Sequence, residues 1–405
     1  MEVSKRTERL GTETAFEVLA EVNGLRREGK DIVSFCIGQP DFDTPRYIKD
    51  AAIKAINEGK TGYTDSAGIL PAREAIAAYL SRTRKIGVKP EHVVIANGTK
   101  PFIAYAVACT TDFGVGDEVI YPNPGYPIYE SQIIANGAVP VALPLSEKKK
   151  FSFDMEELKR KISNRTKMLI INSPHNPTGG IIEEDDLKEV AALAKKHDFW
   201  VYADEIYCQI AYDKEFKSIA SLPGMYERTI ISDGASKTYA MTGWRIGYMA
   251  NPTLAKHIAR WVTNNESCAN HMTQYALKEA IEGPQDENKR MVASYKERRD
   301  LTVKLLNEID GVSCLTPGGA FYVFPNVTKA VQKLGLKDSE DLRRLLLKHG
   351  VAVLSDIHFG KRNPGDPEQH IRLSYVASKE NILEGLRRMK EVMGGKGQGE
   401  AVSWW

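Results

Sequence analysis

The sequence predicts an α/β fold in which a large domain, built on a mostly parallel seven-stranded sheet, is joined to a smaller α/β domain. Two observations lead to this prediction. From His92 onward, short runs rich in β-branched and aromatic residues alternate with helical stretches, which is typical of parallel strands connected by helices. In addition, 405 residues of which 42% are hydrophobic are enough to bury the cores of two domains.

The first part of the chain predicts two helices that follow polar loops. A glycine-bearing loop, Gly38-Gln39-Pro40-Asp41, closes an apolar run and leads to Thr44 and Pro45. Thr44 as N-cap and Pro45 as the first helical residue predict a helix there. Its apolar positions are Ile48, Ala52 and Ile56. Pro71 opens another amphipathic helix. The apolar face of that helix carries Ile76, Ala77 and Leu80.

Seven apolar runs are expected to form the large sheet. They are HVVIAN (92–97), DEVIYP (117–122), VPVALPL (139–145), TKMLIIN (166–172), FWVYAD (199–204), TIISDG (229–234) and IGYMA (246–250). Ligands of such sheets lie at the carboxyl ends of the strands. Polar residues that can carry chemistry follow these runs: Gly98, Thr99, Asn172, Asn176, Asp204 and Lys237.

The C-terminal part predicts the smaller α/β unit, which we expect to pair with the N-terminal residues. A long helical pattern over 291–308 leads to PGGAFYVFPNV, a helix over 339–349 and the runs VAVLSD and HIRLSYV. The large domain is therefore expected to span 45–290, and the small domain 1–44 and 291–393. The glycine-rich tail 394–405 is expected to be disordered.

Composition excludes several classes of partner. The chain has 55 Lys and Arg residues and 53 Asp and Glu residues, a net charge of +2, so we expect no nucleic-acid partner. The N-terminus lacks the apolar segment of a signal peptide, and no apolar run approaches the roughly 20 residues that span a bilayer, so we expect a cytoplasmic protein without a membrane partner. Five widely spaced cysteines without a CxxC pair predict packed thiols, and no metal ligands are assigned.

The stretch 233–248, DGASKTYAMTGWRIGY, places Lys237 among small residues and follows it with Arg245. A lysine amine attacks an aldehyde only if desolvation or a neighbouring cation lowers its pKa. Arg245 is such a cation, and its guanidinium can also grip a phosphate through two hydrogen bonds. A lone lysine is more often a surface residue. The remaining motifs favour the Schiff-base hypothesis.

Three further motifs could hold a flat, phosphorylated cofactor. Residues 97–101, NGTKP, lie between a strand and a helix, where free amides form an anion site. Asp204 could keep a heteroaromatic nitrogen protonated while Tyr207 bonds a phenolic oxygen; the alternative is a helix N-cap beside a core tyrosine. Asn176 could donate to the same oxygen, although the Pro and Gly residues after it are typical of a simple turn.

Two other residues point to ligand contacts, each with an alternative. Tyr126 lies on a proline-stiffened loop and could stack on a flat ring, or it is a structural aromatic. Arg372 lies between apolar residues in HIRLSY, so its guanidinium needs a carboxylate partner. That partner is either a substrate or an internal Asp or Glu.

Eight motifs together resemble the class I and II pyridoxal-phosphate aminotransferases of fold type I, most closely the prokaryotic aspartate and aromatic aminotransferase subgroup. The motifs are IGQPDFDTP, GYTDSAG, NGTK, NPGYP, NSPHNPTGG, YADEIY, SKTYAMTGWRIGY and RLSY. They follow the order of the family from about Leu10 to about Val392. Eight motifs in order are far more specific than any one of them.

The resemblance implies a role for each matching residue in binding pyridoxal 5′-phosphate. Lys237 is the Schiff-base lysine and proton shuttle, and Asp204 pairs with the pyridinium nitrogen. Tyr207 and Asn176 bond the ring O3′, and Tyr126 stacks on the ring. The phosphate cup is formed by Gly98, Thr99, Lys100 and Arg245, with Tyr63 from the other subunit of a homodimer. Substrate-binding positions are Gly38, Asn176 and Arg372.

The chain departs from the family at two positions. Many relatives have a tryptophan in place of Tyr126, and a hydroxyl residue in place of Gly234. We expect Ser236, directly before Lys237, to supply the missing phosphate contact.

The resemblance implies an aminotransferase that moves the amino group of an L-amino acid (aspartate, or an aromatic or neutral one) to a 2-oxo acid by a ping-pong mechanism, with 2-oxoglutarate as the acceptor. One alternative is another fold type I enzyme, such as a carbon–sulfur β-lyase, because loop residues choose the outcome of the cofactor chemistry. A more remote alternative is a ligand-sensing domain of a transcriptional regulator. No helix-turn-helix segment precedes the motifs, and Lys237 is present with the full cup, so this alternative is disfavoured.

Overall fold

The computed structural model describes residues 1–8 and 10–394, and its largest sheet has seven strands in the order β2-β8-β7-β6-β5-β3-β4. The central strands run parallel, whereas β8 is antiparallel to both β2 and β7. All seven predicted runs form strands of this sheet, and the mostly parallel sheet is confirmed. The bounds are β2 Val93–Ala96, β3 Glu118–Asn123, β4 Val139–Pro144, β5 Thr166–Asn172, β6 Trp200–Asp204, β7 Thr229–Gly234 and β8 Gly247–Ala250.

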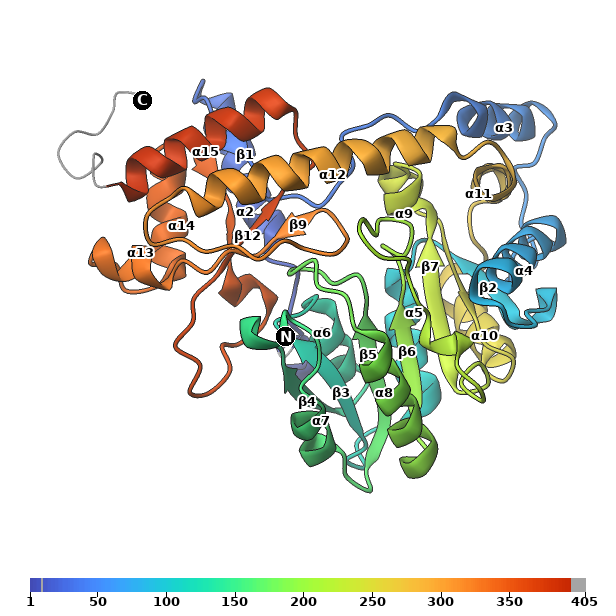
Figure 1. Cartoon of the computed structure of the whole chain (residues 1–405). Helices are drawn as coiled ribbons and strands as arrows, with labels where there is room; N and C mark the ends of the chain where they lie inside the picture. The colour runs from blue at the N-terminus through green and yellow to red at the C-terminus, as the bar shows by residue number, and fades with distance from the viewer. Residues whose placement is uncertain (9, 395–405) are drawn as a thin grey trace.

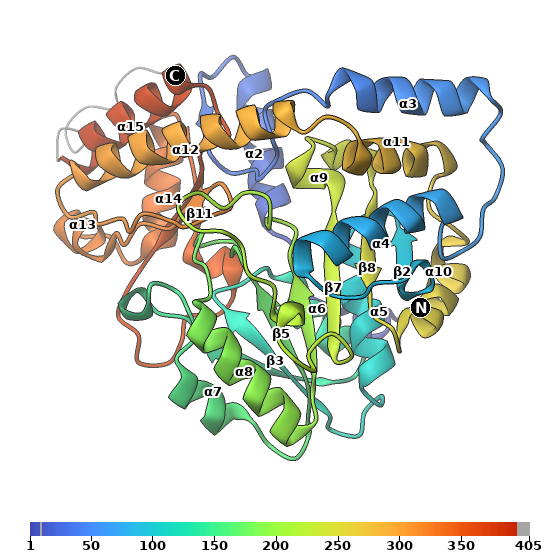
Figure 2. The same ribbon diagram turned by 45° about the vertical axis from the view of Figure 1, so that its right-hand side comes forward.

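Helices cover both faces of this sheet (Figures 1 and 2). In β5, Met168 and Ile170 pack with one layer of helices, while Leu169 and Ile171 pack with the other, as the two-residue period of a strand requires. The first layer contains α5 Lys100–Thr110, α6 Ile128–Ala135 and α10 Ala255–Glu266. The opposite side carries α3 Arg46–Asn57, α4 Leu70–Arg84, α7 Met155–Lys161, α8 Glu184–His197 and α11 His271–Glu282.

The two helices predicted near the N-terminus both form, but the cap of the first differs from the prediction. Pro45 occupies the N-cap position of α3, and the Thr44 hydroxyl instead donates to the carbonyl oxygen of Ala240 at 2.7 Å. Ile48 is buried as expected, whereas Ile56 lies on the solvent side of the helix, with 49% of its surface exposed. The apolar face predicted for α4 is buried, and Pro71 lies in its first turn.

Two smaller sheets lie beside the large one. Strand β1 (Val33–Ser34) pairs in parallel with β10 (Val351–Ala352), so the N-terminal residues lie next to the C-terminal unit. The other sheet has the order β11-β12-β9 and is antiparallel, with bounds Leu354–Ser355, Ile371–Ser374 and Tyr322–Val323. The run VAVLSD therefore contributes to both sheets.

Helix α12 (Asp286–Asn307) begins before the predicted start at 291 and runs across the top of Figure 1 between the two parts of the molecule. It packs against α15 (Lys379–Met393). The other helices are α1 Lys5–Glu8, α2 Ala15–Arg27, α9 Ala235–Thr238, α13 Thr328–Lys333 and α14 Ser339–Lys348. Short 3-10 turns are η1 Pro90–His92, η2 Glu147–Lys149, η3 Ile219–Ser221, η4 Thr242–Trp244 and η5 Asp356–Phe359.

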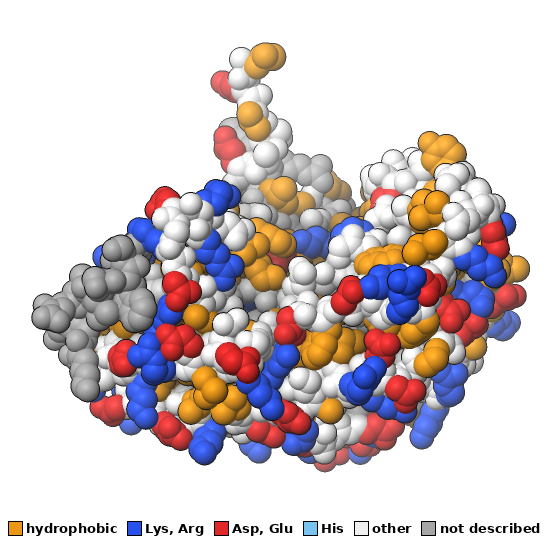
Figure 3. Space-filling model, turned by 90° about the horizontal axis from the view of Figure 1, so that it is seen from above, with side chains coloured by type: hydrophobic (Ala, Val, Ile, Leu, Met, Phe, Trp, Pro, Cys, Tyr) orange, Lys and Arg blue, Asp and Glu red, His pale blue; other side chains and the backbone are white. Residues whose placement is uncertain are grey.

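The surface and the thiols agree with the composition. Positive and negative side chains are intermixed over the face seen in Figure 3, which is hollowed between two raised parts. Across residues 1–8 and 10–394, no helix is long and apolar enough to cross a membrane. All five cysteines are free, and Cys36, Cys208 and Cys314 are buried. The tail predicted to be disordered lies, from residue 395 on, outside the described residues.

A buried ion-pair network joins α4 to the large sheet. The Nη2 atom of Arg84 lies 2.9 Å from Oε2 of Glu205 and 3.4 Å from Oδ2 of Asp233, and all three side chains are 3% exposed. Removing one partner of a buried pair leaves charge without compensation, which is strongly destabilising. Arg84 therefore pairs with two carboxylates, Glu205 directly after β6 and Asp233 near the end of β7.

We expect Arg84→Met to lower the free energy of unfolding by about 3–5 kcal/mol, because it leaves both carboxylates buried without a cation. Arg46→Met is the matched control, since Arg46 pairs with Asp50 on the exposed face of α3 and exposed pairs contribute about 0–1 kcal/mol. Urea and thermal denaturation of the two variants measure the difference. Equal losses would contradict this role of Arg84.

Candidate active site

Except for Gly98, the polar residues predicted at the strand ends line one cavity of about 470 Å³, a size typical of small-molecule sites. Its walls come from both parts of the molecule, since Lys237 follows β7 and Arg372 lies on β12. The predicted residues that line it are Gly38, Thr99, Lys100, Tyr126, Asn176, Asp204, Tyr207, Ser236, Lys237, Arg245 and Arg372.

Lys237 lies on the single helical turn α9, and its ammonium donates to the carbonyl oxygen of Gly38 at 2.6 Å. The surrounding protein excludes water from the amine and lowers the pKa of Lys237 to about 8. The charge of Glu13 opposes this shift, while the charges of Arg372 and Arg245 add to it. The expected desolvation is therefore present, and it outweighs the effect of Arg245.

Asp204 ends β6 and lines the cavity. Its Oδ2 accepts a hydrogen bond from the Tyr129 hydroxyl at 2.7 Å, and its Oδ1 accepts from the Ile206 amide at 3.3 Å. Burial raises the pKa of the Asp204 carboxyl to about 6. No helix begins at Asp204, so the N-cap alternative is wrong. Within the described residues it forms no ion pair, which leaves it able to bind a cationic group of a ligand.

Tyr207 and Asn176 lie on the same side of the cavity as Arg372. The hydroxyls of Tyr207 and Tyr322 share a hydrogen bond of 2.7 Å. The amide oxygen of Asn176 accepts from Nη1 of Arg372 at 3.2 Å, so its amide nitrogen is the atom that can donate to a ligand. The backbone amide of Asn176 donates to Oδ1 of Asn172 at 2.9 Å, which fixes the turn after β5.

Arg372 is 4% exposed, and its guanidinium stacks between two rings, 4.6 Å from the centre of Tyr322 and 4.8 Å from that of Phe359. Its Nη2 donates to the carbonyl oxygen of Cys36. Among residues 1–8 and 10–394, Nε has no hydrogen-bond partner and the guanidinium has no carboxylate partner. A buried cation of this kind is costly unless it is paired. The internal Asp or Glu considered from the sequence is therefore not found, and an anionic ligand fits.

The phosphate-binding side of the cavity depends on close glycine packing. Gly98 has a φ of +95°, and a Cβ there would lie 2.3 Å from Nη2 of Arg245, so a side chain would displace the guanidinium. Thr99 precedes α5, whose first amides have no partner within the helix. A Cβ on Gly234 would lie 3.0 Å from Cα of Gly247, so a side chain at this position would crowd the adjacent strand β8.

Comparison with known proteins identifies the family. The family model for aminotransferase class I and II matches residues 30–389. The chain belongs to this family. It is 38% identical over 96% of its length to a probable aspartate/prephenate aminotransferase of Aquifex aeolicus, of which it covers 98%. It is also 38% identical over 90% of its length to an aspartate aminotransferase of Pyrococcus abyssi, of which it covers 92%.

The fold comparison agrees with the sequence comparison. Thermus thermophilus aspartate aminotransferase, solved with maleate, matches 97% of this chain with a TM-score of 0.90 and 34% identity, and all of that chain is covered (100%). The predicted family, its fold and the aminotransferase activity are therefore confirmed. Tyr63 does not line the cavity of this aminotransferase chain, because it lies on the loop between α3 and α4 with 89% of its surface exposed.

Sequence reasoning missed Glu13, which enters the cavity of the aminotransferase from the segment before α2. Its Oε2 accepts from Nζ of Lys100 at 3.0 Å and from the hydroxyl of Tyr126 at 3.0 Å. No motif surrounds Glu13, and it lies far in sequence from the other site residues. No sequence signal could therefore have identified it. Tyr129 and Tyr322 were also missed, although Tyr322 lies in the quoted segment PGGAFYVFPNV.

We expect Glu13→Gln to lower the pKa of Lys237 further below its ordinary value, because the carboxylate charge now stabilises the ammonium form. The pH dependence of Lys237 acylation in cofactor-free protein, followed by mass spectrometry of its peptide, measures this shift. Glu17→Gln, an exposed position on α2, serves as the control. A midpoint that stays the same or moves to higher pH would show that Glu13 does not act on Lys237.

Proposed function

We propose that this aminotransferase binds pyridoxal 5′-phosphate in the cavity and moves the amino group of an L-amino acid to a 2-oxo acid, with 2-oxoglutarate as the acceptor, by a ping-pong mechanism. One observation carries the proposal: the desolvated amine of Lys237 shares one cavity with two arginines and with Asp204, which forms no ion pair within the described residues. This arrangement fits a ligand that has an aldehyde, a basic ring nitrogen and a phosphate.

The residues present fit the cofactor part by part. Arg245 lies beside the N-terminus of α5, where Gly98, Thr99 and Ser236 complete a site for a phosphate. At the other end, Asp204 can pair with a protonated ring nitrogen, and that cation would in turn favour its ionised form. The remaining contacts follow the family resemblance, with Lys100 in the cup, Tyr126 at the ring face, and Tyr207 and Asn176 at the ring hydroxyl.

Lys237 is proposed to hold the cofactor and to move the proton of the substrate Cα. The cofactor, when bound, supplies an electron sink for the negative charge left on that carbon. An amine with a pKa of about 8 can both accept and return a proton near neutral pH. The hydrogen bond to the Gly38 carbonyl holds the amine against a segment that also lines the cavity.

Arg372 and Gly38 are proposed to bind the α-carboxylate of every substrate, with Asn176 supporting the guanidinium. Two parallel hydrogen bonds from a guanidinium would orient the Cα–H bond toward Lys237. Besides Lys237, the lysine that lines this cavity within the described residues is Lys100, and it is paired with Glu13. The pair has no net charge, so it neither attracts nor repels an acidic substrate side chain strongly. This supports the proposal that acidic, aromatic and neutral side chains are discriminated only loosely.

A panel of amino donors tests this function directly. Aspartate, phenylalanine and alanine would each be supplied with 2-oxoglutarate or pyruvate, and formation of the new amino acid would be measured. We expect turnover only when donor and acceptor are both present. Release of ammonia and pyruvate without an acceptor would instead identify a carbon–sulfur β-lyase.

We expect Arg372→Lys to lower kcat/KM for every donor by a similar factor, about 10- to 100-fold, if about 1.4–2.7 kcal/mol of oriented binding is lost. A lysine supplies charge without the planar pair of hydrogen bonds. Arg344→Lys, an exposed arginine of α14, is the control. A loss confined to dicarboxylic donors would show that Arg372 recognises the side chain instead.

We also propose the domain division expected from the sequence, with residues 45–290 in one domain and 1–44 with 291–393 in the other. The pairing of β1 with β10 supports it, because it joins the N-terminal segment to the C-terminal unit. Substrate would then bind between the domains, since Lys237 belongs to the first and Arg372 to the second.

A homodimer with shared active sites is proposed from the position of Tyr63. This aromatic side chain is almost fully exposed, and by resemblance it completes the phosphate cup of the neighbouring chain. Mixing Lys237→Ala and Tyr63→Ala chains then gives hybrid dimers with one intact site and one doubly altered site. At equal mixing, about a quarter of all sites would be intact in a symmetric dimer. Activity no higher than that of the two parents, with hybrids confirmed, would contradict shared sites.

A further inference from the structure

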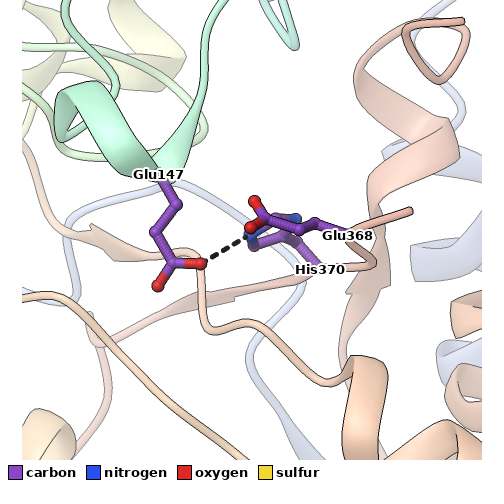
Figure 4. Close-up of side chains that lie close together, drawn as sticks. All are labelled: Glu147, Glu368 and His370. Carbon is purple, nitrogen blue, oxygen red and sulfur yellow. Dashed lines mark ion pairs between the residues drawn. The ribbon is translucent and has the colours of Figure 1, made fainter. Parts of the chain in front are cut away.

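A second group of chemistry-bearing side chains lies outside the active-site cavity. Glu147, Glu368 and His370 approach one another so that one potential ligand atom of each lies within 4.8 Å of the others (Figure 4). They border a separate cavity of about 40 Å³. A cavity needs about 10–15 Å³ to hold one water molecule, so this one has room for an ion and a water ligand.

His370 is the observation that distinguishes this group from an ordinary acidic cluster. It is 6% exposed, and across the described part of the chain its Nε2 has no hydrogen-bond partner. Oε2 of Glu147 lies 3.6 Å from this nitrogen, which is too long for a hydrogen bond. A buried polar atom without a partner is costly. Nε2 of His370 lies close to carboxylate oxygens of Glu147 and Glu368, an arrangement that suits an imidazole bound to a metal ion.

Surrounding residues hold the three side chains in place. The His370 ring stacks on Phe324 with centroids 4.8 Å apart and an angle of 2°, and its backbone amide donates to Oδ2 of Asp356 at 3.1 Å. The amide of Asn326 donates to Oε2 of Glu147 at 2.9 Å. Such outer contacts orient the ligands of protein metal sites.

The charges nearby leave the glutamates available. Arg362, which borders the same cavity, is held by Asp356 at 3.0 and 3.2 Å. Among residues 1–8 and 10–394, Glu368 forms no ion pair.

We infer that Glu147, Glu368 and His370 form a binding site for a first-row divalent metal ion of the zinc class. One imidazole nitrogen and two carboxylate oxygens suit Zn²⁺, whereas Mg²⁺ and Ca²⁺ prefer oxygen ligands alone. The 3.6 Å between Nε2 and Oε2 is close to the separation of two ligands around a tetrahedral ion with bonds of about 2.0–2.2 Å. No sequence motif indicates this site, because Glu147 lies far from the other two ligands along the chain.

The ion would link the two parts of the aminotransferase. Glu147 lies on η2, which follows β4 of the seven-stranded sheet, while Glu368 and His370 precede β12 of the small sheet. Arg372 is two residues beyond His370 on that strand. The site is therefore structural, and it would fix the strand that carries Arg372 relative to the large sheet.

The test uses the full-length protein after removal of metal with a chelator. Isothermal titration with Zn²⁺ is expected to show one ion per chain, and Zn²⁺ is expected to raise Tm. Glu368→Gln and His370→Gln are each expected to weaken binding by at least about ten-fold. Glu368→Gln is the variant less expected to disturb folding, because replacing His370 also removes its stacking on Phe324. His257→Gln, an exposed histidine of α10, is the matched control and should bind as the wild type does.

Two outcomes would overturn the inference. One is wild-type affinity and stoichiometry in both folded variants, which would place any bound ion elsewhere. The other is an anomalous diffraction peak for zinc away from Nε2 of His370, or no peak, in crystals grown with Zn²⁺. Excess Mg²⁺ should not displace Zn²⁺, and displacement at equal concentration would exclude a site with a nitrogen ligand.

Discussion

The burial of a lysine amine beside two arginines is the interaction on which this active site depends. Removing water from an ammonium ion is unfavourable, and nearby cations add repulsion, so the neutral amine of Lys237 becomes accessible near neutral pH. The carboxylates Glu13 and Asp204 oppose the shift and keep the pKa at about 8. Such an arrangement needs a rigid frame, because the charges would otherwise pair with one another. The ends of the parallel strands and the aromatic rings around Arg372 provide it.

The fold and most of the site could be predicted because their signals are local. Apolar runs of strand length, separated by helical patterns, located every strand of the large sheet. The carboxyl ends of those strands then located Asp204 and Lys237 in one cavity. The sequence shows glycines at positions 98 and 234, but not why a side chain is disfavoured there. The structure gives the reason, because a Cβ would crowd Arg245 at the first position and Gly247 at the second.

What could not be predicted depends on contacts between residues far apart in sequence. Threonine is a typical helix-capping residue, yet the hydroxyl of Thr44 donates to the carbonyl oxygen of Ala240, which lies 196 residues away in sequence. Glu13 reaches Lys100 across 87 residues, and no local pattern encodes that approach. The same is true of His370, whose glutamate neighbour comes from the other part of the chain. Local propensity decides where elements form, whereas the charge balance of a site depends on how those elements are packed.

The central claim, that Lys237 holds pyridoxal 5′-phosphate as a Schiff base, is tested most directly by chemical reduction. The protein would be incubated with the cofactor, reduced with borohydride, digested and analysed by mass spectrometry. The account predicts a pyridoxyl-phosphate adduct on the peptide that contains Lys237, and no adduct when an amino-acid donor has first released the cofactor from the lysine. An adduct on another lysine, such as Lys100, or no adduct at all would contradict it.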